Sequence, residues 1–408
     1  MLTILINAYA CSPNMGSEPG MAWNWCINLA QYCELHIITE EEFRNNIENT
    51  LPSLSQGKNM HFYYNPVSDK IRRMCWNQGD WRFYYYYKRW QYRAYKIALD
   101  IINATHIDII HQLNMIGFRE PGYLWKIDKP FVWGPVDAKE DFPITFLKEA
   151  SVKTRFVIHL KNFLTRTQLR YDKRIREAVN KASILIAASS EAKKSFDKYF
   201  HKVSFLLNET GCYPISNRKD EVRECEYFNI LWVGKFDFRK QLGLAIKILA
   251  GLKNSNIRLH IVGDEKTIFY QNLVKQLNVS ELCIWYGKIT HKEVQNVMLK
   301  SDILLFTSVA EGTPHVVLEA LGNQLPVICF NTCGQGDSIN DSVGVKVELT
   351  TPKQSSKEFI RNIEYLFHHK EILQQLSHNC IDRQKELSWN TKALQMKELY
   401  QKVLVPKI

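Results

Sequence analysis

Short apolar runs alternate with longer amphipathic segments along most of the chain. The runs have the length of buried strands, and in the first half they cover residues 3–8, 35–39, 60–64, 107–111, 131–133, 184–187 and 203–206. In the second half they cover residues 228–233, 258–262, 283–286, 303–306 and 327–330. Strands that alternate with helices favour parallel sheets with helices on both faces. The pattern therefore predicts an α/β protein with two Rossmann-like parallel-sheet domains.

A polar, highly charged segment separates the two series of strands. Residues 213–226 (YPISNRKDEVRECE) include Pro214 and suit a linker. We therefore predict a first domain over residues 1–212, a second over 227–387, and an amphipathic C-terminal helix over 388–408. Open parallel sheets bind ligands beyond the carboxyl ends of their strands. Two such sheets that face each other predict an interdomain cleft, where small-molecule sites are common.

The composition is that of a globular protein, with 45% hydrophobic and 23% charged residues in 408. No apolar run approaches the roughly 18–20 residues that span a bilayer, and the N-terminus lacks a basic leader. We therefore expect a cytoplasmic protein, or one that is peripheral on the inner face of the plasma membrane. The ten cysteines are scattered, which favours buried reduced thiols, and no His/Cys cluster has metal-ligand spacing.

The formal net charge of +11 calls for an anionic partner. Nucleic acid, anionic lipid and phosphorylated substrates all fit this charge. Nucleic acid ranks last because the sequence contains no recognisable nucleic-acid-binding module.

The most informative segment is residues 301–326, SDILLFTSVAEGTPHVVLEALGNQLP, which predicts a strand, a glycine turn and a helix start. Thr313 offers an N-cap and Pro314 suits the first helical position. Glu311 then precedes the helix, while Glu319 lies in its second turn among apolar residues and needs partners or a ligand. The helix start provides a seat for phosphate, and Gly312 permits close approach. Acids at both ends of a phosphate site suit a nucleotide-sugar.

This segment resembles the donor-site signature of retaining family 4 glycosyltransferases, which have the GT-B fold. The resemblance implies that Glu311 is catalytic and contacts the donor sugar, and that Glu319 binds the ribose diol. It implies donor contacts at Gly312, Thr313 and Pro314. An alternative is that Glu311 is a solvated loop residue and Glu319 an internal ion-pair partner.

Residues 231–249 (LWVGKFDFRKQLGLAIKIL) resemble a second family motif, a strand that ends at Gly234 and is followed by two cations. Lys235 and Lys240 match the cations that bind the donor diphosphate, where they would stabilise the leaving group without a metal. The first of these is usually Arg in the family, so Lys235 is a departure, and Arg239 is a candidate to compensate. A solvated basic turn is the alternative.

Further donor-site residues are implied by the same resemblance. Gly263 and Lys288 follow strands near the expected nucleobase, and the Gly334–Gly336 turn follows the expected last core strand. In the first half, Gly16 lies in a glycine-rich loop that would approach the diphosphate. His111 closes a strand where relatives touch an outer hydroxyl of the donor sugar. For His111 a purely structural role is equally open.

Two segments combine basic and aromatic or apolar residues. Residues 81–95 hold nine aromatic and four basic side chains, and residues 153–181 hold nine Lys or Arg against Asp172 and Glu177. Such segments suit an anionic membrane surface, which would deliver a lipid-linked acceptor to the first domain. Core-facing aromatics and a solvated helix face are the alternative.

Together the motifs predict a retaining hexosyltransferase for lipopolysaccharide or other cell-surface polysaccharide biosynthesis. It would transfer a sugar from a UDP- or GDP-linked donor to a glycan or lipid-linked acceptor, with no cofactor or metal. The resemblance further implies a C-terminal helix that returns to the first, acceptor-binding domain. An epimerase or a glycan phosphorylase on the same scaffold stays open, as does a non-catalytic membrane-associated binding protein.

Overall fold

The computed structural model describes residues 1–76, 81–139, 141–213, 226–264, 267–312 and 314–404, and it divides into two compact units. The first unit comprises Met1–Glu140, Arg166–Thr210 and Trp389–Ile408, and the second comprises Asp141–Thr165 and Gly211–Ser388. Residues 141–165 thus belong to the second unit, although the sequence placed them in the first domain. The expected linker lies largely at 214–225, outside the described residues.

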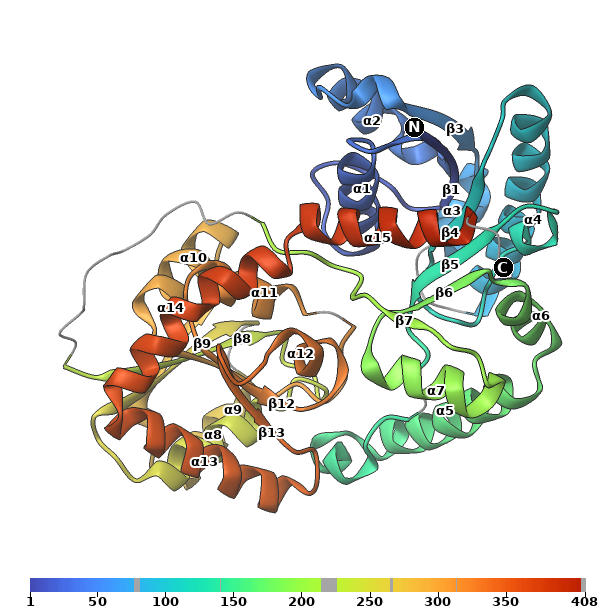
Figure 1. The fold of residues 1–408 in the computed structure, drawn as a ribbon. Coiled ribbons are helices and arrows are strands. Elements are labelled where there is room, and N and C mark those ends of the chain that lie inside the picture. Colours follow the sequence, from blue (N-terminus) through green and yellow to red (C-terminus); the bar gives the residue numbers. More distant parts are fainter. Residues whose placement is uncertain (77–80, 140, 214–225, 265–266, 313, 405–408) are drawn as a thin grey trace. The chain divides into compact units, whose positions relative to one another are not determined.

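The first unit is built on a seven-stranded parallel sheet in the order β3-β2-β1-β4-β5-β6-β7 (Figure 1). Its strands are β1 (Leu2–Ala8), β2 (Cys33–Glu40), β3 (Met60–Asn65), β4 (Ile109–Asn114), β5 (Phe131–Val136), β6 (Ile184–Ala187) and β7 (Phe205–Leu206). Its helices include α1 (Ser17–Leu29), α2 (Arg44–Thr50), α3 (Asp69–Cys75), α4 (Trp81–Ala104), α6 (Lys173–Lys181), α7 (Ser190–Phe200) and α15 (Trp389–Leu404).

The C-terminal helix α15 is integrated into this first unit. It packs along α1, where the rings of Trp25 and Trp389 meet edge to face at 5.7 Å (Figure 1). The Tyr32 hydroxyl donates to Asn390 Oδ1 at 2.7 Å. The last helix therefore completes the core of a unit whose last strand ends more than 180 residues earlier in the chain.

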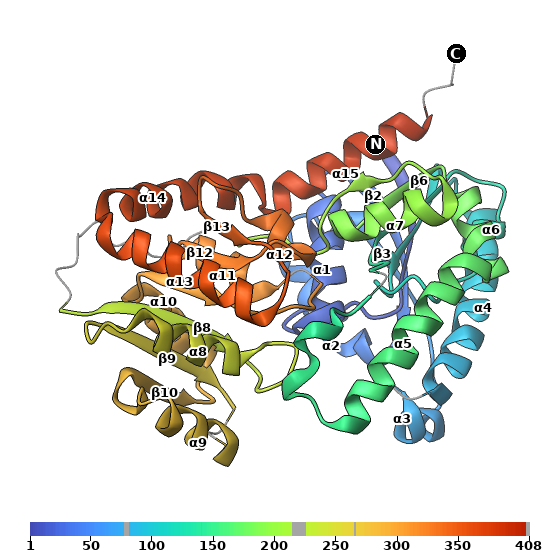
Figure 2. The ribbon, with the colours of Figure 1, turned by 90° about the horizontal axis from the view of Figure 1, so that it is seen from below.

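The second unit contains a six-stranded parallel sheet in the order β10-β9-β8-β11-β12-β13 (Figure 2). Its strands are β8 (Phe228–Gly234), β9 (Ile257–Gly263), β10 (Cys283–Gly287), β11 (Ile303–Phe306), β12 (Val327–Phe330) and β13 (Gly344–Val347). Its helices are α8 (Leu242–Leu252), α9 (Ile268–Gln276), α10 (His291–Lys300), α11 (His315–Gly322), α12 (Cys333–Ser338), α13 (Pro352–His368) and α14 (Lys370–Glu386). Helix α5 (Val152–Tyr171) passes from the second unit into the first.

The strand order of the second unit determines where a ligand is expected. Numbered within the unit, the order is 3-2-1-4-5-6, that of the doubly wound dinucleotide-binding fold. Its order reverses between β8 and β11, and ligands bind such sheets beyond the carboxyl ends of the strands at that point. The strand order therefore predicts a ligand site at the loops that follow β8 and β11.

The predicted fold class of two parallel-sheet α/β domains is confirmed, and each predicted strand is present within a few residues. The sequence missed β13, so the Gly334–Gly336 segment does not follow the last strand. It lies in α12 instead. Pro314 is the N-cap of α11 and not its first residue, while Thr313 lies outside the described residues. The cysteines in the described ranges are buried thiols.

No described helix has both the length and the apolar character needed to cross a membrane.

The core of the second unit offers a direct test of its packing. Phe359 of α13 is fully buried and meets the Phe330 ring edge to face at 5.0 Å. We predict that Phe359→Ala lowers the free energy of unfolding by about 3–5 kcal/mol, because it leaves a cavity. Arg361→Ala, an exposed position on the same helix, should change it by less than about 0.5 kcal/mol. Urea unfolding followed by circular dichroism measures both, and equal effects would contradict the assigned core.

Candidate functional site

The loops that follow β8 and β11 are joined by an ion pair. Lys240 Nζ lies 2.5 Å from Glu311 Oε1, and both side chains are about one-fifth exposed. The ammonium group also lies 5.2 Å from the centre of the Phe306 ring, at the end of β11. The Ser308 hydroxyl lies 3.1 Å from the same Glu311 oxygen. The structure thus brings together two predicted site residues that are 71 positions apart in the chain.

Backbone contacts hold the same two loops together. The Thr307 hydroxyl donates to Lys240 O at 2.8 Å, and Val309 N–H donates to Arg239 O at 2.9 Å. Trp232 Nε1 donates to the Thr307 hydroxyl at 3.0 Å. These bonds join the two loops to each other and to Trp232 on β8, and they therefore fix both loops to the sheet. They also pair polar groups that are rarely left unpaired when buried. Lys240 and Glu311 are therefore positioned before any ligand binds.

The other predicted cations differ in how they are engaged. Arg239 Nη2 lies 2.6 Å from Asp237 Oδ2, and its Nε lies 3.1 Å and 3.0 Å from the two Asp237 oxygens. Lys235 is exposed and forms no ion pair within the part of the chain that the structure describes. The proposed compensation of Lys235 by Arg239 would therefore require Arg239 to leave Asp237.

Gly234 and Gly263 end two paired strands, β8 and β9, and lie opposite each other. A Cβ on Gly263 would lie 2.0 Å from Gly234 O. The backbone of this edge is therefore packed so closely that a side chain at Gly263 cannot fit. Asp264 follows and accepts from Phe236 N–H at 2.8 Å, which orders the start of the β8 loop. The need for Gly263 is explained by packing, and its nearness to a nucleobase stays a prediction.

Glu319 lies on α11 and faces a cavity of about 420 Å³ in the second unit. Its Oε1 lies 3.3 Å from His291 Nε2, and its Oε2 accepts from Gln295 Nε2 at 3.3 Å. The side chain is 28% exposed, so it is less buried than the apolar sequence around it predicted. The wall of the cavity also includes Tyr213, Lys292, Asn296, His315 and Asn323.

Gly312 and Lys288 lie on loops that follow β11 and β10. Gly312 O accepts from Gly334 N–H at 3.0 Å, which ties the segment before α11 to the start of α12. Lys288 is exposed and follows Gly287, whose φ of 65° favours glycine. Both residues thus lie at the carboxyl-end side of the same sheet as Lys240 and Glu311.

His111 belongs to the first unit, and its surroundings favour the structural alternative to the catalytic role predicted for it. It is fully buried, Nδ1 lies 2.6 Å from the Tyr400 hydroxyl, and Nε2 lies 2.5 Å from Gly134 O. Burial lowers the pKa of His111 to about 4, so the ring is neutral at pH 7. With both nitrogens bonded within the unit, His111 joins β4 to α15 and β5.

Gly16, the other site residue predicted in the first unit, is the N-cap of α1 and is exposed. A Cβ there would meet no atom within 4 Å, so packing within the protein does not require a glycine at this position. Next to it, burial raises the pKa of Glu18, whose Oε1 accepts from Ile116 N–H at 3.2 Å.

The two basic segments differ in how they are used. Phe83, Tyr87 and Trp90 on α4 are buried in the core of the first unit, whereas Trp81 and Tyr85 on the same helix are exposed. Helix α5 contains no acidic residue and exposes an apolar row together with basic side chains; the row comprises Val152, Phe156, Val157, Leu160, Phe163 and Leu164. The core-facing alternative therefore holds for part of α4, and α5 is exposed, as both a solvated helix face and a membrane-facing helix would be.

Sequence reasoning missed several residues that line the cavity or support the site. Ser308 precedes Glu311 by three positions, and this spacing in the sequence could have predicted the hydrogen bond between the two side chains. His291 and Gln295 contact Glu319 from α10, and only the tertiary fold places α10 beside α11. The pairing of α10 with α11 carries no signal in a single sequence.

The two parallel-sheet units, together with structural neighbours, define a GT-B fold. HepE of Anabaena, solved in complex with UDP, superposes with a TM-score of 0.61 at 12% identity over 98% of this chain and 100% of that one. Residues 216–386 match the model of the family described as Glycosyl transferases group 1.

Curated relatives match shorter parts of the chain. The lipopolysaccharide glucosyltransferase WaaG of Escherichia coli is 27% identical over 206 residues, which is 45% of this chain and 54% of the relative. Protein CapJ of Staphylococcus aureus is 34% identical over 100 residues, which is 24% of this chain and 26% of the relative. The chain thus spans about a quarter to a half of the length of these curated relatives.

The buried His111 predicts a pH dependence of stability. Its pKa is about 4 in the folded chain against 6.5 for an ordinary histidine, so between these values the unfolded chain binds more protons. We predict that the contribution of His111 to stability is fully present above about pH 6.5 and falls by about 3 kcal/mol as the pH drops to 4. Urea midpoints measured from pH 4 to 8 should show a shallower slope for His111→Gln. The exposed His378→Gln should keep the wild-type slope, and identical slopes in all three proteins would refute the assignment.

Proposed function

We propose that the chain is a retaining glycosyltransferase that transfers a hexose from a UDP-linked donor to a saccharide acceptor in cell-surface polysaccharide assembly. The observation that carries the proposal is the Lys240–Glu311 pair at the point where the strand order of the second sheet reverses. The family match over residues 216–386 supports the transferase class. Relatives named for lipopolysaccharide synthesis support a saccharide acceptor, and UDP bound in HepE supports the donor.

The donor would lie along the carboxyl ends of β8 and β11 and beside the N-terminal half of α10 in the second unit. Glu319 would accept hydrogen bonds from the ribose hydroxyls, since its carboxylate faces the cavity and is only partly engaged by His291 and Gln295. The diphosphate would occupy the N-terminal end of α11, where unpaired backbone N–H groups and the helix dipole favour an anion. Lys235 and Lys240 would supply the compensating positive charge.

Catalysis would then depend on charge that develops on the leaving diphosphate. As the bond between the anomeric carbon and the phosphate oxygen breaks, Lys240 would stabilise the growing negative charge. The acceptor hydroxyl would attack the same face of the sugar and pass its proton to the departing phosphate oxygen. Glu311 would hold Lys240 in position and orient the sugar hydroxyls. The residues present would thus perform the transfer without a cofactor.

Two substitutions separate binding from transfer. Glu311→Ala should lower transfer from UDP-glucose or another accepted donor by at least about 100-fold, because an oriented charged group is lost from the reacting sugar. Glu319→Ala should weaken UDP binding by about 10-fold or more with a smaller effect on turnover, because charge-assisted hydrogen bonds to the ribose are lost. Radiolabelled transfer and isothermal titration with UDP measure the two effects.

The exposed Glu364→Ala on α13 serves as the control and should leave both quantities unchanged. If Glu311→Ala transfers sugar at near wild-type rate while it remains folded, the site assignment is wrong.

We further propose that α5 lies on an anionic membrane surface, which would bring the enzyme to a lipid-linked acceptor. Val152, Phe156, Leu160 and Phe163 recur at helical spacing and are exposed, and Lys153, Arg155 and Lys161 flank them. Helices with exposed apolar rows and only basic charges bind anionic interfaces.

A basic depression lies close to α5 along the chain. A cavity of about 400 Å³ is lined by Lys148, Lys247, Lys353 and Lys357, and its wall includes Glu149 just before α5. Glu149 is engaged by Lys247 at 3.3 Å, so three lysines outweigh it at the rim. Such a rim suits anionic head groups when α5 lies at the interface.

Removal of two aromatic side chains tests the membrane contact. Phe156→Ser with Phe163→Ser should lower binding to phosphatidylglycerol vesicles by about 10-fold or more, because each Phe contributes about 1.5–3 kcal/mol when buried. The control is Val203→Ser with Ile268→Ser, which replaces side chains that are 80% and 74% exposed elsewhere. Co-sedimentation measures binding, and equal losses in the two double variants would refute a specific role for α5.

A further inference from the structure

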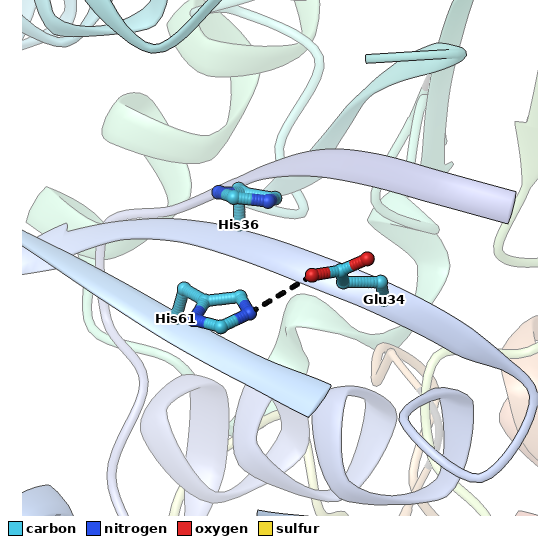
Figure 3. Close-up of side chains that lie close together, drawn as sticks. All are labelled: Glu34, His36 and His61. Carbon is cyan, nitrogen blue, oxygen red and sulfur yellow. Dashed lines mark hydrogen bonds and ion pairs between the residues drawn. The ribbon is translucent and has the colours of Figure 1, made fainter. Parts of the chain in front are cut away.

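Three potential metal ligands from two neighbouring strands lie together in the first unit (Figure 3). Glu34 and His36 lie on β2, two residues apart and therefore on one face of the strand. His61 lies on β3 and is the register partner of His36. The sequence showed no His/Cys cluster with metal-ligand spacing, because His61 is 25 residues from His36 in the chain. The strand register brings the three side chains together.

The distances among these side chains are those of a nearly formed site. Glu34 Oε1 lies 3.1 Å from His61 Nε2, and one ligand atom from each residue lies within 4.8 Å of the other two. The rings of His36 and His61 are stacked with their centres 4.9 Å apart. Ligand atoms around a tetrahedral zinc ion are about 3.4 Å apart, given bonds of about 2.1 Å. Small rotations of the half-exposed Glu34 and His61 side chains would close the difference.

His36 carries the second, independent indication of a ligand. It is 5% exposed, its Nδ1 lies 2.9 Å from the Tyr63 hydroxyl, and its Nε2 is buried with no hydrogen-bond partner among the described residues. An unpaired buried polar atom costs about 1–3 kcal/mol. Metal-binding histidines show this arrangement, with one nitrogen bonded to an oxygen and the other turned to the ion.

We propose that Glu34, His36 and His61 bind a divalent transition-metal ion of the zinc class. Two imidazoles and one carboxylate are a ligand set that zinc accepts, with water in the fourth position. Oxygen-seeking ions such as Mg²⁺ and Ca²⁺ are disfavoured by the two nitrogen ligands.

The ion would join the edge strand β3 to β2. Strand β3 is the last strand on its side of the sheet, so it has a neighbour on one side only. A ligand that binds only the folded form stabilises it in proportion to its saturation. The ion would therefore protect the β3 edge, and this role does not depend on the donor site of the second unit.

The test uses the full chain, freed of metal with a chelator and then titrated with Zn²⁺. We expect one tightly held Zn²⁺ per chain by elemental analysis after gel filtration, with a rise in melting temperature on binding. His61→Ala should weaken binding by at least about 10-fold. Tyr63→Phe keeps all three ligands and removes only the hydroxyl beside His36, so it should weaken binding by about 10-fold without loss of fold.

The control is His106→Ala, which removes an exposed histidine that also contacts a carboxylate, Asp108 at 3.0 Å. It should bind Zn²⁺ like the unmodified chain. The proposal is overturned if the unmodified chain retains no Zn²⁺ after gel filtration. It is equally overturned if His61→Ala binds Zn²⁺ as well as His106→Ala does.

Discussion

The proposed site of the second unit depends on the ion pair between Lys240 and Glu311. It joins the loops after β8 and β11 at the reversal of strand order, where doubly wound sheets bind ligands. The backbone of both loops is fixed, because the Thr307 hydroxyl and the Val309 N–H bond to the carbonyl groups of Lys240 and Arg239. A charge that is held in place before ligand binding needs no reorganisation when charge develops on the ligand. In the proposed function, the fixed loops would therefore hold the pair where charge develops on the donor.

The surrounding charges explain why the pair suits an anionic ligand. Without ligand, Glu311 balances Lys240, and Asp237 balances Arg239. The two ion pairs therefore carry no net charge that would repel a bound diphosphate. The exposed Lys235 is available as a further cation. Lys is a point charge and not a bidentate fork, so Lys235 adds attraction with little demand on geometry. Positional precision would then come from Lys240 and from the N-terminal end of α11.

Local patterns in the sequence predicted the strands and helices. The surroundings of individual side chains depend on tertiary contacts, which local patterns do not predict. The buried runs 184–187, 303–306 and 327–330 matched their strands to the residue, whereas β13 is only half-buried and lacked such a run. The motif predicted loop positions for Lys240 and Glu311, and the structure has them in the loops after β8 and β11. The structural role of His111 depends on Tyr400, 289 residues away, which no local pattern reports. Likewise, the sequence predicts that Glu34 and His36 lie on one face of a strand, but it does not predict the strand register that brings His61 beside them.

The two sheets differ in the side chains that lie at the carboxyl ends of their strands. In the first unit the order also reverses between two strands, β1 and β4, but buried amides occupy their carboxyl ends. Asn7 Nδ2 donates to Gln91 Oε1 at 2.7 Å and to Gln112 Oε1 at 2.9 Å, and Asn114 Nδ2 donates to Ala10 O at 2.9 Å. These groups are neutral and provide no charge for a phosphate, and Oδ1 of Asn7 and Oδ1 of Asn114 have no hydrogen-bond partner among the described residues. The second unit has the Lys240–Glu311 ion pair at the equivalent edge, and this charge is the physical reason to propose the anionic donor there.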